Sequence, residues 1–280
     1  MQELKGMPVV KSIMEGLSAE IEVLSEANIF PKLSVIRIGD REDDAAYERS
    51  IIKRFSAVGA CVDVIALSTD VTQEKLEEEI IRLNNDERVH GILIFRPLPK
   101  GLSEDRSKDI ISPEKDVDCM SIKNNAHIFA GNTAAFPPCT PQAVIELMDF
   151  YNIDLAGKKV SVVGRSLVVG KPLAMMLLAK NATVTICHTK TVYLAEECKK
   201  ADVLVACAGS AKMIKNHYVH SDQIIIDVGI NMDGGKLCGD VDYEAVTGIV
   251  KAITPVPGGI GTITTAVLLK HTIQSAMRSL

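Results

Sequence analysis

The sequence contains no tryptophan, and aromatic residues make up only 4% of its 280 residues. It also lacks a CxxC pair, an HExxH motif and any apolar run long enough to span a bilayer. Its seven cysteines are scattered and odd in number, which favours reduced thiols over disulfides or a zinc cage. The net charge of −5 gives no support to a nucleic-acid surface. We therefore expect no metal site, no nucleic-acid partner and no membrane partner.

The first residues, Met1 to Lys5, lack the basic and then apolar pattern of a secretion signal, which predicts a cytoplasmic protein. A content of 47% hydrophobic and 24% charged residues is typical of a soluble globular enzyme.

Apolar strands and amphipathic helices alternate along the whole chain. Strands are predicted at 32–38, 61–67, 89–95, 160–163, 182–191, 202–206, 223–228 and 251–254. Helices are predicted at 9–28, 43–58, 72–84, 104–111, 141–151, 173–180 and 262–279, and a loop at 113–132. This alternation predicts an α/β protein with mostly parallel sheets, and the length suggests two domains.

The segment from Val160 to Pro172 reads as a buried strand, a glycine turn and the start of a helix. Gly164 ends the apolar run and permits a sharp turn, whereas Gly170 opens the helix and Pro172 suits its first turn. Such a turn directs backbone N–H groups and the positive end of a helix towards a phosphate. The spacing is not GxGxxG, so a plain strand-to-helix turn without a ligand is the alternative.

The residues after the next strand indicate which nucleotide would bind. An NAD-binding Rossmann domain usually has an acidic residue there for the ribose hydroxyls, but this chain has Thr189 and Lys190. Arg165 lies in the first turn. Two cations and no carboxylate suit a ribose 2′-phosphate and so predict NADP; the alternative is that both are solvated surface charges.

Several motifs, in order along the chain, resemble one family. They are Lys115-Asp116-Val117-Asp118, Pro138-Cys139-Thr140-Pro141, Val163-Gly164-Arg165-Ser166, Cys187-His188, Asp227-Val228-Gly229-Ile230-Asn231, Gly239-Asp240-Val241 and Thr254-Pro255-Val256-Pro257-Gly258-Gly259-Ile260-Gly261. The chain resembles the bifunctional methylenetetrahydrofolate dehydrogenase/methenyltetrahydrofolate cyclohydrolase (FolD) family from its first strand to its last helix.

This resemblance implies a homodimer that acts on tetrahydrofolate derivatives with NADP. It implies a folate-binding catalytic domain of residues 1–138 plus about 265–280, to which the C-terminal helix returns, and an NADP-binding Rossmann domain of residues 139–264. The implied catalytic residues are Tyr47, which stacks on the folate, and Asp118, which anchors the pterin. The remaining implied substrate residues are Pro257, Gly258 and Gly259. The cofactor residues, with Lys190 added from the charge argument, are Gly164, Arg165, Ser166, Thr189, Lys190 and Ile230.

The departures from the family pattern lie on the folate side. Ile51 stands where the family has a lysine one helical turn after the tyrosine, and Phe95 stands where it has a glutamine. Hydride transfer depends mainly on positioning, whereas hydrolysis needs a proton-transfer group. We therefore expect a dehydrogenase with weak or absent cyclohydrolase activity. The alternatives are a fully bifunctional enzyme, in which Arg54, Arg96 or a water replaces the lysine, and a catalytically silent paralogue.

A smaller departure follows Asp118. Cys119-Met120 stands where the family usually has Gly-Phe.

Overall fold

The computed structural model describes residues 1–132 and 134–280, which form two compact units. The six-stranded unit contains residues 1–12 and 140–264, and the three-stranded unit contains residues 13–139 and 265–280. Residues 1–12 were predicted in the other domain. They group with the six-stranded unit because Gln2 and Glu3 pair with Ala252 and Ile253. Each unit is described by itself.

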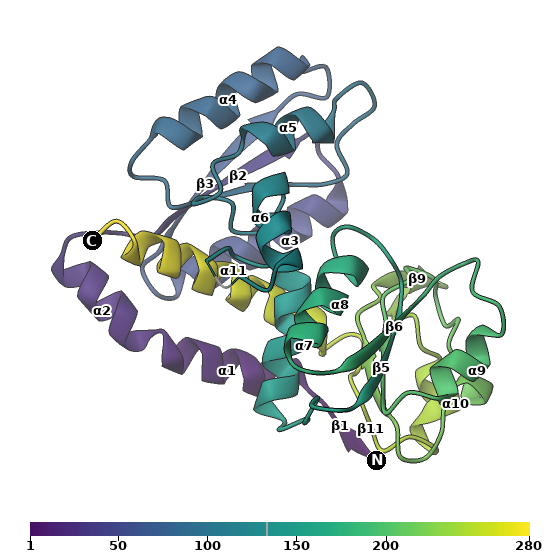
Figure 1. Cartoon of the computed structure of the whole chain (residues 1–280). Helices are drawn as coiled ribbons and strands as arrows, with labels where there is room; N and C mark the ends of the chain where they lie inside the picture. The colour runs from purple at the N-terminus through teal and green to yellow at the C-terminus, as the bar shows by residue number, and fades with distance from the viewer. Residues whose placement is uncertain (133) are drawn as a thin grey trace. The chain divides into compact units, whose positions relative to one another are not determined.

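The three-stranded unit is built on a parallel sheet. Its strands are β2 (Lys32–Ile38), β3 (Cys61–Leu67) and β4 (Gly91–Ile94), in the order β3-β2-β4. Its helices include α2 (Ser18–Glu26), α3 (Glu42–Ser56), α4 (Gln73–Asn85), α5 (Glu104–Ile110) and α6 (Ile122–Phe129). Helices α4 and α5 lie side by side over the sheet (Figure 1). The sheet and α4 together bury an aliphatic core that includes Ile36, Leu76, Ile80, Leu83 and Ile92.

Both ends of α4 are capped by side chains that hydrogen-bond to its backbone. Thr72 accepts a hydrogen bond from the backbone N–H of Lys75 at 3.2 Å, as an N-cap residue does. At the other end, Lys115 Nζ donates to the carbonyl oxygens of Leu83, Asn84 and Asp86 at 2.7–3.1 Å. A cation is favoured at this end by the helix dipole. The same contacts fasten the chain three residues before Asp118.

The six-stranded unit has an entirely parallel main sheet in the order β1-β11-β8-β7-β5-β6. The strands are β1 (Gln2–Glu3), β5 (Lys159–Val163), β6 (Thr183–Cys187), β7 (Val203–Ala206), β8 (Ile224–Asp227) and β11 (Ala252–Ile253). Strand β1 lies beside β11 at the edge (Figure 1). The chain moves from β5 to β6 on one side and then to β7 on the other. Ligands bind at such a switch point in open α/β sheets.

Further elements complete the six-stranded unit. They are α8 (Gly170–Ala179), α9 (Leu194–Lys199), the 3-10 turn η1 (Asn216–Tyr218), the antiparallel hairpin β9 (Asn231–Asp233) and β10 (Lys236–Cys238), and α10 (Tyr243–Thr247).

Three helices have residues in both units: α1 (Gly6–Gly16), α7 (Cys139–Phe150) and α11 (Ile260–Met277). The single helix predicted at 9–28 is two helices, α1 and α2, which meet at Leu17. The C-terminal part of α11 groups with the three-stranded unit, which confirms the predicted return of this helix. In the part of the chain that the structure describes, no helix has the length and apolar character needed to cross a membrane.

Candidate functional site

The turn between β5 and α8 is closed by contacts that only glycine permits. A Cβ atom on Gly170 would lie 2.2 Å from the carbonyl oxygen of Gly164. A Cβ atom on Gly164, whose φ is 144°, would lie 2.4 Å from the carbonyl oxygen of Cys207, which directly follows β7. The turn after β5 and the loop after β7 therefore meet at the switch point of the sheet.

Ser166 orders the start of α8. Its hydroxyl accepts hydrogen bonds from the backbone N–H groups of Val169 and Gly170, at 3.0 and 3.4 Å. Because the main strands are parallel, the residues that follow β5, β6 and β8 share one edge of the sheet. All the predicted cofactor residues lie at this carboxyl edge: Gly164, Arg165, Ser166, Thr189, Lys190 and Ile230.

Two of the predicted cofactor residues at this edge carry a positive charge. Arg165 and Lys190 are exposed, and no ion pair joins either cation to a carboxylate among the described residues. Thr189 is also exposed, and Ile230 is 64% exposed although it is a large apolar residue. Unpaired cations beside the start of a helix fit a nucleotide with an additional phosphate.

Two buried carboxylates hold the loops of the same edge. Asp240 accepts hydrogen bonds from the backbone N–H groups of Ala208, Gly209 and Ser210 at 2.6–3.0 Å, and from Asn231 Nδ2 at 2.9 Å. Asp240 has no exposed surface, and its contacts join the loop after β7 to the start of β9.

Asp227, at the end of β8, acts in the same way. It accepts from the backbone N–H groups of Gly229, Asp240 and Val241 at 2.9–3.0 Å. Burial raises the pKa of Asp227 to about 7, and the three N–H donors oppose this shift. A Cβ atom on Gly239 would lie 1.8 Å from Asp227 Oδ2, so glycine is required there. The sequence motifs that contain Asp227 and Asp240 were identified, but their role in holding backbone N–H groups was not predicted. The glycine directly before Asp240 could have indicated a close backbone contact.

In the three-stranded unit, Tyr47 lies against Phe95, and Ile51 follows Tyr47 one turn later on the same helix. The rings of Tyr47 (on α3) and Phe95 (after β4) have centroids 5.6 Å apart and are tilted by 38°. Ile51, one turn after Tyr47, has no exposed surface, and Phe95 is 7% exposed. The two positions that carry a polar pair in the family pattern are therefore buried and apolar here.

Asp118 is held by two donors. Arg96 Nη2 donates to its Oδ2 at 3.0 Å, and the backbone N–H of Cys139, the first residue of α7, donates to its Oδ1 at 2.9 Å. The side chains of Arg96 and Asp118 are 17% and 21% exposed. Asp118 therefore lies at the surface of this unit with both oxygens oriented.

The neighbouring Asp116 fixes the loop that carries Asp118. Its buried carboxylate accepts from the backbone N–H groups of Met120 and Ser121, both at 2.8 Å, and from Asn124 Nδ2 at 3.1 Å. Burial raises the pKa of Asp116. Cys119 lies between these contacts with a φ of 54°, a left-handed conformation that favours glycine. Sequence reasoning did not identify this role of Asp116.

The predicted substrate residues Pro257, Gly258 and Gly259 lie in the six-stranded unit, whereas Tyr47 and Asp118 lie in the three-stranded unit. The carbonyl oxygen of Gly258 accepts from the N–H of Gly6 at 2.8 Å, which fastens this loop to the start of α1. Gly258 has a φ of 104°.

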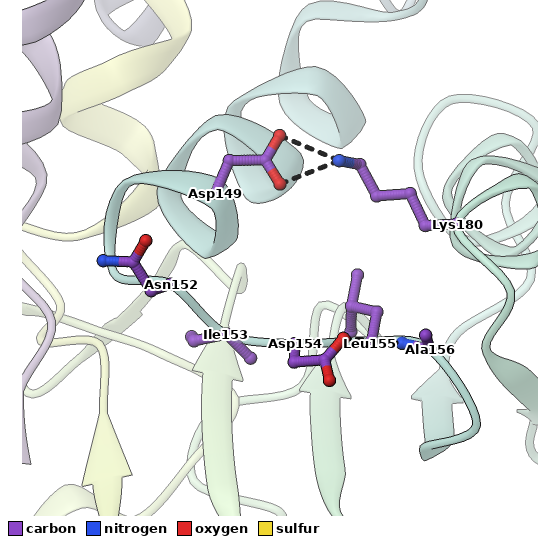
Figure 2. Close-up of a pocket in the computed structure, with 7 residues that line it drawn as sticks. All are labelled: Asp149, Asn152, Ile153, Asp154, Leu155, Ala156 and Lys180. Carbon is purple, nitrogen blue, oxygen red and sulfur yellow. Dashed lines mark hydrogen bonds and ion pairs between the residues drawn. The ribbon is translucent and has the colours of Figure 1, made fainter.

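Two cavities of the six-stranded unit lie apart from all these residues. Figure 2 shows the first, of about 440 Å³, where Lys180 pairs with Asp149 at 2.7 Å above the loop of residues 152–156. The second, of about 560 Å³, lies where β7, β8 and β11 begin and is lined by Asp202, Ile224 and Ala252 among others. Neither cavity contains a residue predicted from the sequence to bind substrate or cofactor.

A parallel sheet with a glycine turn at its switch point and cations at its carboxyl edge defines a nucleotide-binding protein of the Rossmann type. Comparison with known families agrees. Residues 138–280 match the tetrahydrofolate dehydrogenase/cyclohydrolase NAD(P)-binding domain, and residues 4–118 match the catalytic domain of the same enzymes. The chain belongs to the tetrahydrofolate dehydrogenase/cyclohydrolase (FolD) family, as the sequence motifs predicted, and is an enzyme of that family.

Individual relatives cover nearly the whole chain. A protein of Clostridioides difficile (strain 630), named bifunctional protein FolD, is 50% identical over 98% of this chain and 96% of its own length. The crystal structure of the bifunctional enzyme FolD from Campylobacter jejuni is 38% identical, covers both chains completely and gives a TM-score of 0.97. The Trypanosoma brucei enzyme, complexed with NADP cofactor and inhibitor, is 34% identical over 98% of this chain and 97% of its own, with a TM-score of 0.92. The predicted two-domain α/β fold class is confirmed.

Proposed function

We propose that this protein is an NADP-dependent 5,10-methylenetetrahydrofolate dehydrogenase of one-carbon metabolism whose cyclohydrolase activity is weak or absent. The observation that carries the second part is the burial of Ile51 and Phe95 beside Tyr47. Opening the methenyl ring requires a group that moves a proton, and neither an isoleucine nor a phenylalanine has one. Hydride transfer needs the reactants to be held in line, which these substitutions leave possible.

The cofactor supplies a hydride acceptor. Support for NADP comes from the unpaired Arg165 and Lys190 at the carboxyl edge, together with the absence of a carboxylate at positions 189–191. The residues of the chain bind and orient the cofactor. The β5–α8 turn would hold its phosphate groups, and Thr189 would supply a hydroxyl to it. Asp118 binds the pterin and Tyr47 stacks on it, as the family pattern implies.

The second candidate is the fully bifunctional enzyme. It is favoured by relatives that are 50% identical and named bifunctional protein FolD. In that case another group must move the proton. Arg96 is paired with Asp118, and burial lowers the pKa of Arg54, but a guanidinium stays protonated and is a poor proton shuttle.

One preparation tests both readings. The reduced cofactor and the methenyl chromophore are followed together for the wild type and for the double variant Ile51→Lys/Phe95→Gln. We expect the wild type to form reduced cofactor while the methenyl compound decays no faster than in buffer. General acid–base catalysis contributes roughly 10²–10⁴-fold, so restoring even part of it should be visible in the double variant.

The matched control is Ile52→Lys/Phe95→Gln. It places the new lysine on the same helix, at a side chain that is 41% exposed. It should not accelerate ring opening. Hydrolysis by the wild type well above the rate in buffer would favour the bifunctional enzyme, and no reduction of NADP would favour a silent paralogue.

A homodimer is also proposed. Strand β3 pairs with β2 along one edge, no strand of residues 1–132 and 134–280 pairs with its other edge, and its apolar side chains are only partly buried. Analytical ultracentrifugation tests this. A cytoplasmic location and the absence of nucleic-acid and membrane partners stay predictions.

A further inference from the structure

The contact between Arg96 and Asp118 is built into the fold of the three-stranded unit. Arg96 directly follows Phe95 at the end of β4, and the segment before Asp118 runs along the same strand. The N–H of Ile92 donates to the carbonyl oxygen of Lys115 at 2.7 Å, and Ile92 pairs with Asp116 in a parallel bridge. The guanidinium and the carboxylate therefore leave the sheet side by side.

After the contacts within the protein are counted, Asp118 and Arg96 still have hydrogen-bond acceptors and donors that a ligand could use. A carboxylate offers about four acceptor positions, two on each oxygen. Cys139 N–H takes one on Oδ1 and Arg96 takes one on Oδ2. The Cys139 thiol also interacts with this carboxylate, but a thiol is a weak donor. One position on each oxygen is therefore left for a strong donor of a ligand. A guanidinium has about five N–H donors, and the bond to Asp118 uses one. The remaining groups are, in order, an acceptor on Oδ1, an acceptor on Oδ2 and a donor on Arg96.

We propose that Arg96 is a specificity residue that binds the 4-oxo group of the pterin beside Asp118. This inference rests on the proposed function, which places the pterin at Asp118. The edge of a 2-amino-4-oxopyrimidine carries, in order, the 2-amino donor, the N3–H donor and the O4 acceptor. This donor–donor–acceptor row is the complement of the row formed by Oδ1, Oδ2 and Arg96.

The order of the row also determines how the ring is oriented. N3–H donates to Oδ2, and O4 then lies against the guanidinium. If the ring were turned over, the 2-amino group would face the N–H groups of Arg96, donor against donor. A 2,4-diaminopyrimidine presents donor, acceptor and donor, and so mismatches the row at two of three positions. Leaving a polar group unpaired in a site only one-fifth exposed is costly.

The test compares two ligands that differ at position 4: tetrahydrofolate and its 4-amino counterpart, tetrahydroaminopterin. Their dissociation constants are measured by calorimetry without oxygen for the wild type, Arg96→Met and Arg96→Gln. Hydrogen bonds to charged groups correspond to roughly 10–100-fold in affinity. We expect the wild type to prefer tetrahydrofolate at least tenfold. Arg96→Met should lose the share of this preference that arises at position 4 and keep the share that arises where N3 faces Asp118 Oδ2, and Arg96→Gln, which keeps an N–H donor, should lie between the two.

Arg88→Met is the control. It removes a guanidinium from the same unit, where Arg88 is paired with Asp86 and is 83% exposed, and should leave the preference unchanged. A wild type that binds both ligands equally overturns the inference, and so does an Arg96→Met protein that keeps the full preference. If Arg96→Met does not fold, Arg96→Gln takes its place, and an Arg96→Gln protein that keeps the full wild-type preference overturns the inference.

Failure of the proposed function has a different signature. A wild type that does not reduce NADP with 5,10-methylenetetrahydrofolate contradicts the proposed function, whatever Arg96 does. If Asp118→Asn binds tetrahydrofolate as tightly as the wild type, the pterin does not lie at Asp118, and the inference fails while the dehydrogenase activity can stand. A wild type that binds tetrahydrofolate through Asp118, with a preference that does not depend on Arg96, overturns the inference alone.

Discussion

The carboxyl edge of the six-stranded unit and the Asp118 region of the three-stranded unit are organised differently. At the first, Asp227 and Asp240 hold backbone N–H groups, and glycines permit contacts that no other residue allows. At the second, Asp116 also holds backbone N–H groups, but further contacts join side chain to side chain: Tyr47 meets Phe95, and Arg96 meets Asp118. Replacing a carboxylate that holds several backbone N–H groups leaves all of those donors without their acceptor. Side chains that pack against one another can be exchanged without moving the backbone, and Ile51 and Phe95, which depart from the family pattern, lie in the second region.

Loss of a carboxylate at the first region should have the largest effect. Asp240→Ala leaves four donors without their acceptor, and we expect the free energy of unfolding to fall by about 3–5 kcal/mol. Urea denaturation measures this. The control is Asp233→Ala, which removes an exposed carboxylate paired with Lys212 from the neighbouring hairpin and should cost less than about 1 kcal/mol. Similar losses in both variants would mean that the Asp240 contacts do not hold the loops.

A methyl group at the glycine turn should have the next largest effect. Gly170→Ala forces the start of α8 away from Gly164, since the new Cβ would lie 2.2 Å from its carbonyl oxygen. Overpacking of this kind costs about 1–3 kcal/mol, and the Michaelis constant for NADP should rise. Gly248→Ala is the matched control, because a Cβ there meets nothing within 4 Å. If the two variants melt and bind alike, the close approach is not required.

Removing a cation from the same edge should change selectivity rather than stability. Arg165 is exposed, so Arg165→Ala should leave the melting temperature nearly unchanged. It should raise the Michaelis constant for NADP roughly 10–100-fold, the range of one charge-assisted hydrogen bond, and barely alter that for NAD. Steady-state kinetics with both cofactors decides. Equal effects on NADP and NAD would show that Arg165 does not meet the 2′-phosphate.

The Asp118 region should tolerate a change that the other region would not. Cys119→Gly relieves a left-handed backbone worth roughly 1–2 kcal/mol but gives up the burial of a small side chain, so the net change should lie within about 1 kcal/mol. Cys198→Gly is the control: Cys198 is fully buried on α9, where glycine lowers helix stability as well, and it should cost about 2 kcal/mol or more. Thermal denaturation compares the two, and equal losses would exclude strain at Cys119.

Long periodic elements could be predicted from the sequence, whereas elements that depend on distant partners could not. Strands β2 and β3 begin and end at the predicted residues. Helix α6 lies within a predicted loop, because its two asparagines are poor helix formers and its N-terminal turn is stabilised from outside, by Asn124 bonded to Asp116. Strand β1 has two residues and exists only because β11, some 250 residues later, is beside it.

The candidate sites also contain features that could be predicted from the sequence and features that could not. Their positions followed from motifs, since the residues after parallel strands must share one edge. The contacts that orient Asp118 could not be predicted, because Arg96 and Cys139 approach it from separate parts of the chain. The role of Asp240 depends on loops about 30 residues away.

The loop after β7 combines two properties that seldom occur together. Its residues Ala208, Gly209 and Ser210 are exposed to solvent, yet their amide hydrogens are bonded to a carboxylate without exposed surface. In deuterated water these amides should exchange as slowly as those of the sheet, because each hydrogen leaves only when the Asp240 cluster opens. The loop has therefore lost its conformational entropy during folding, and a molecule that binds at this edge does not have to order it.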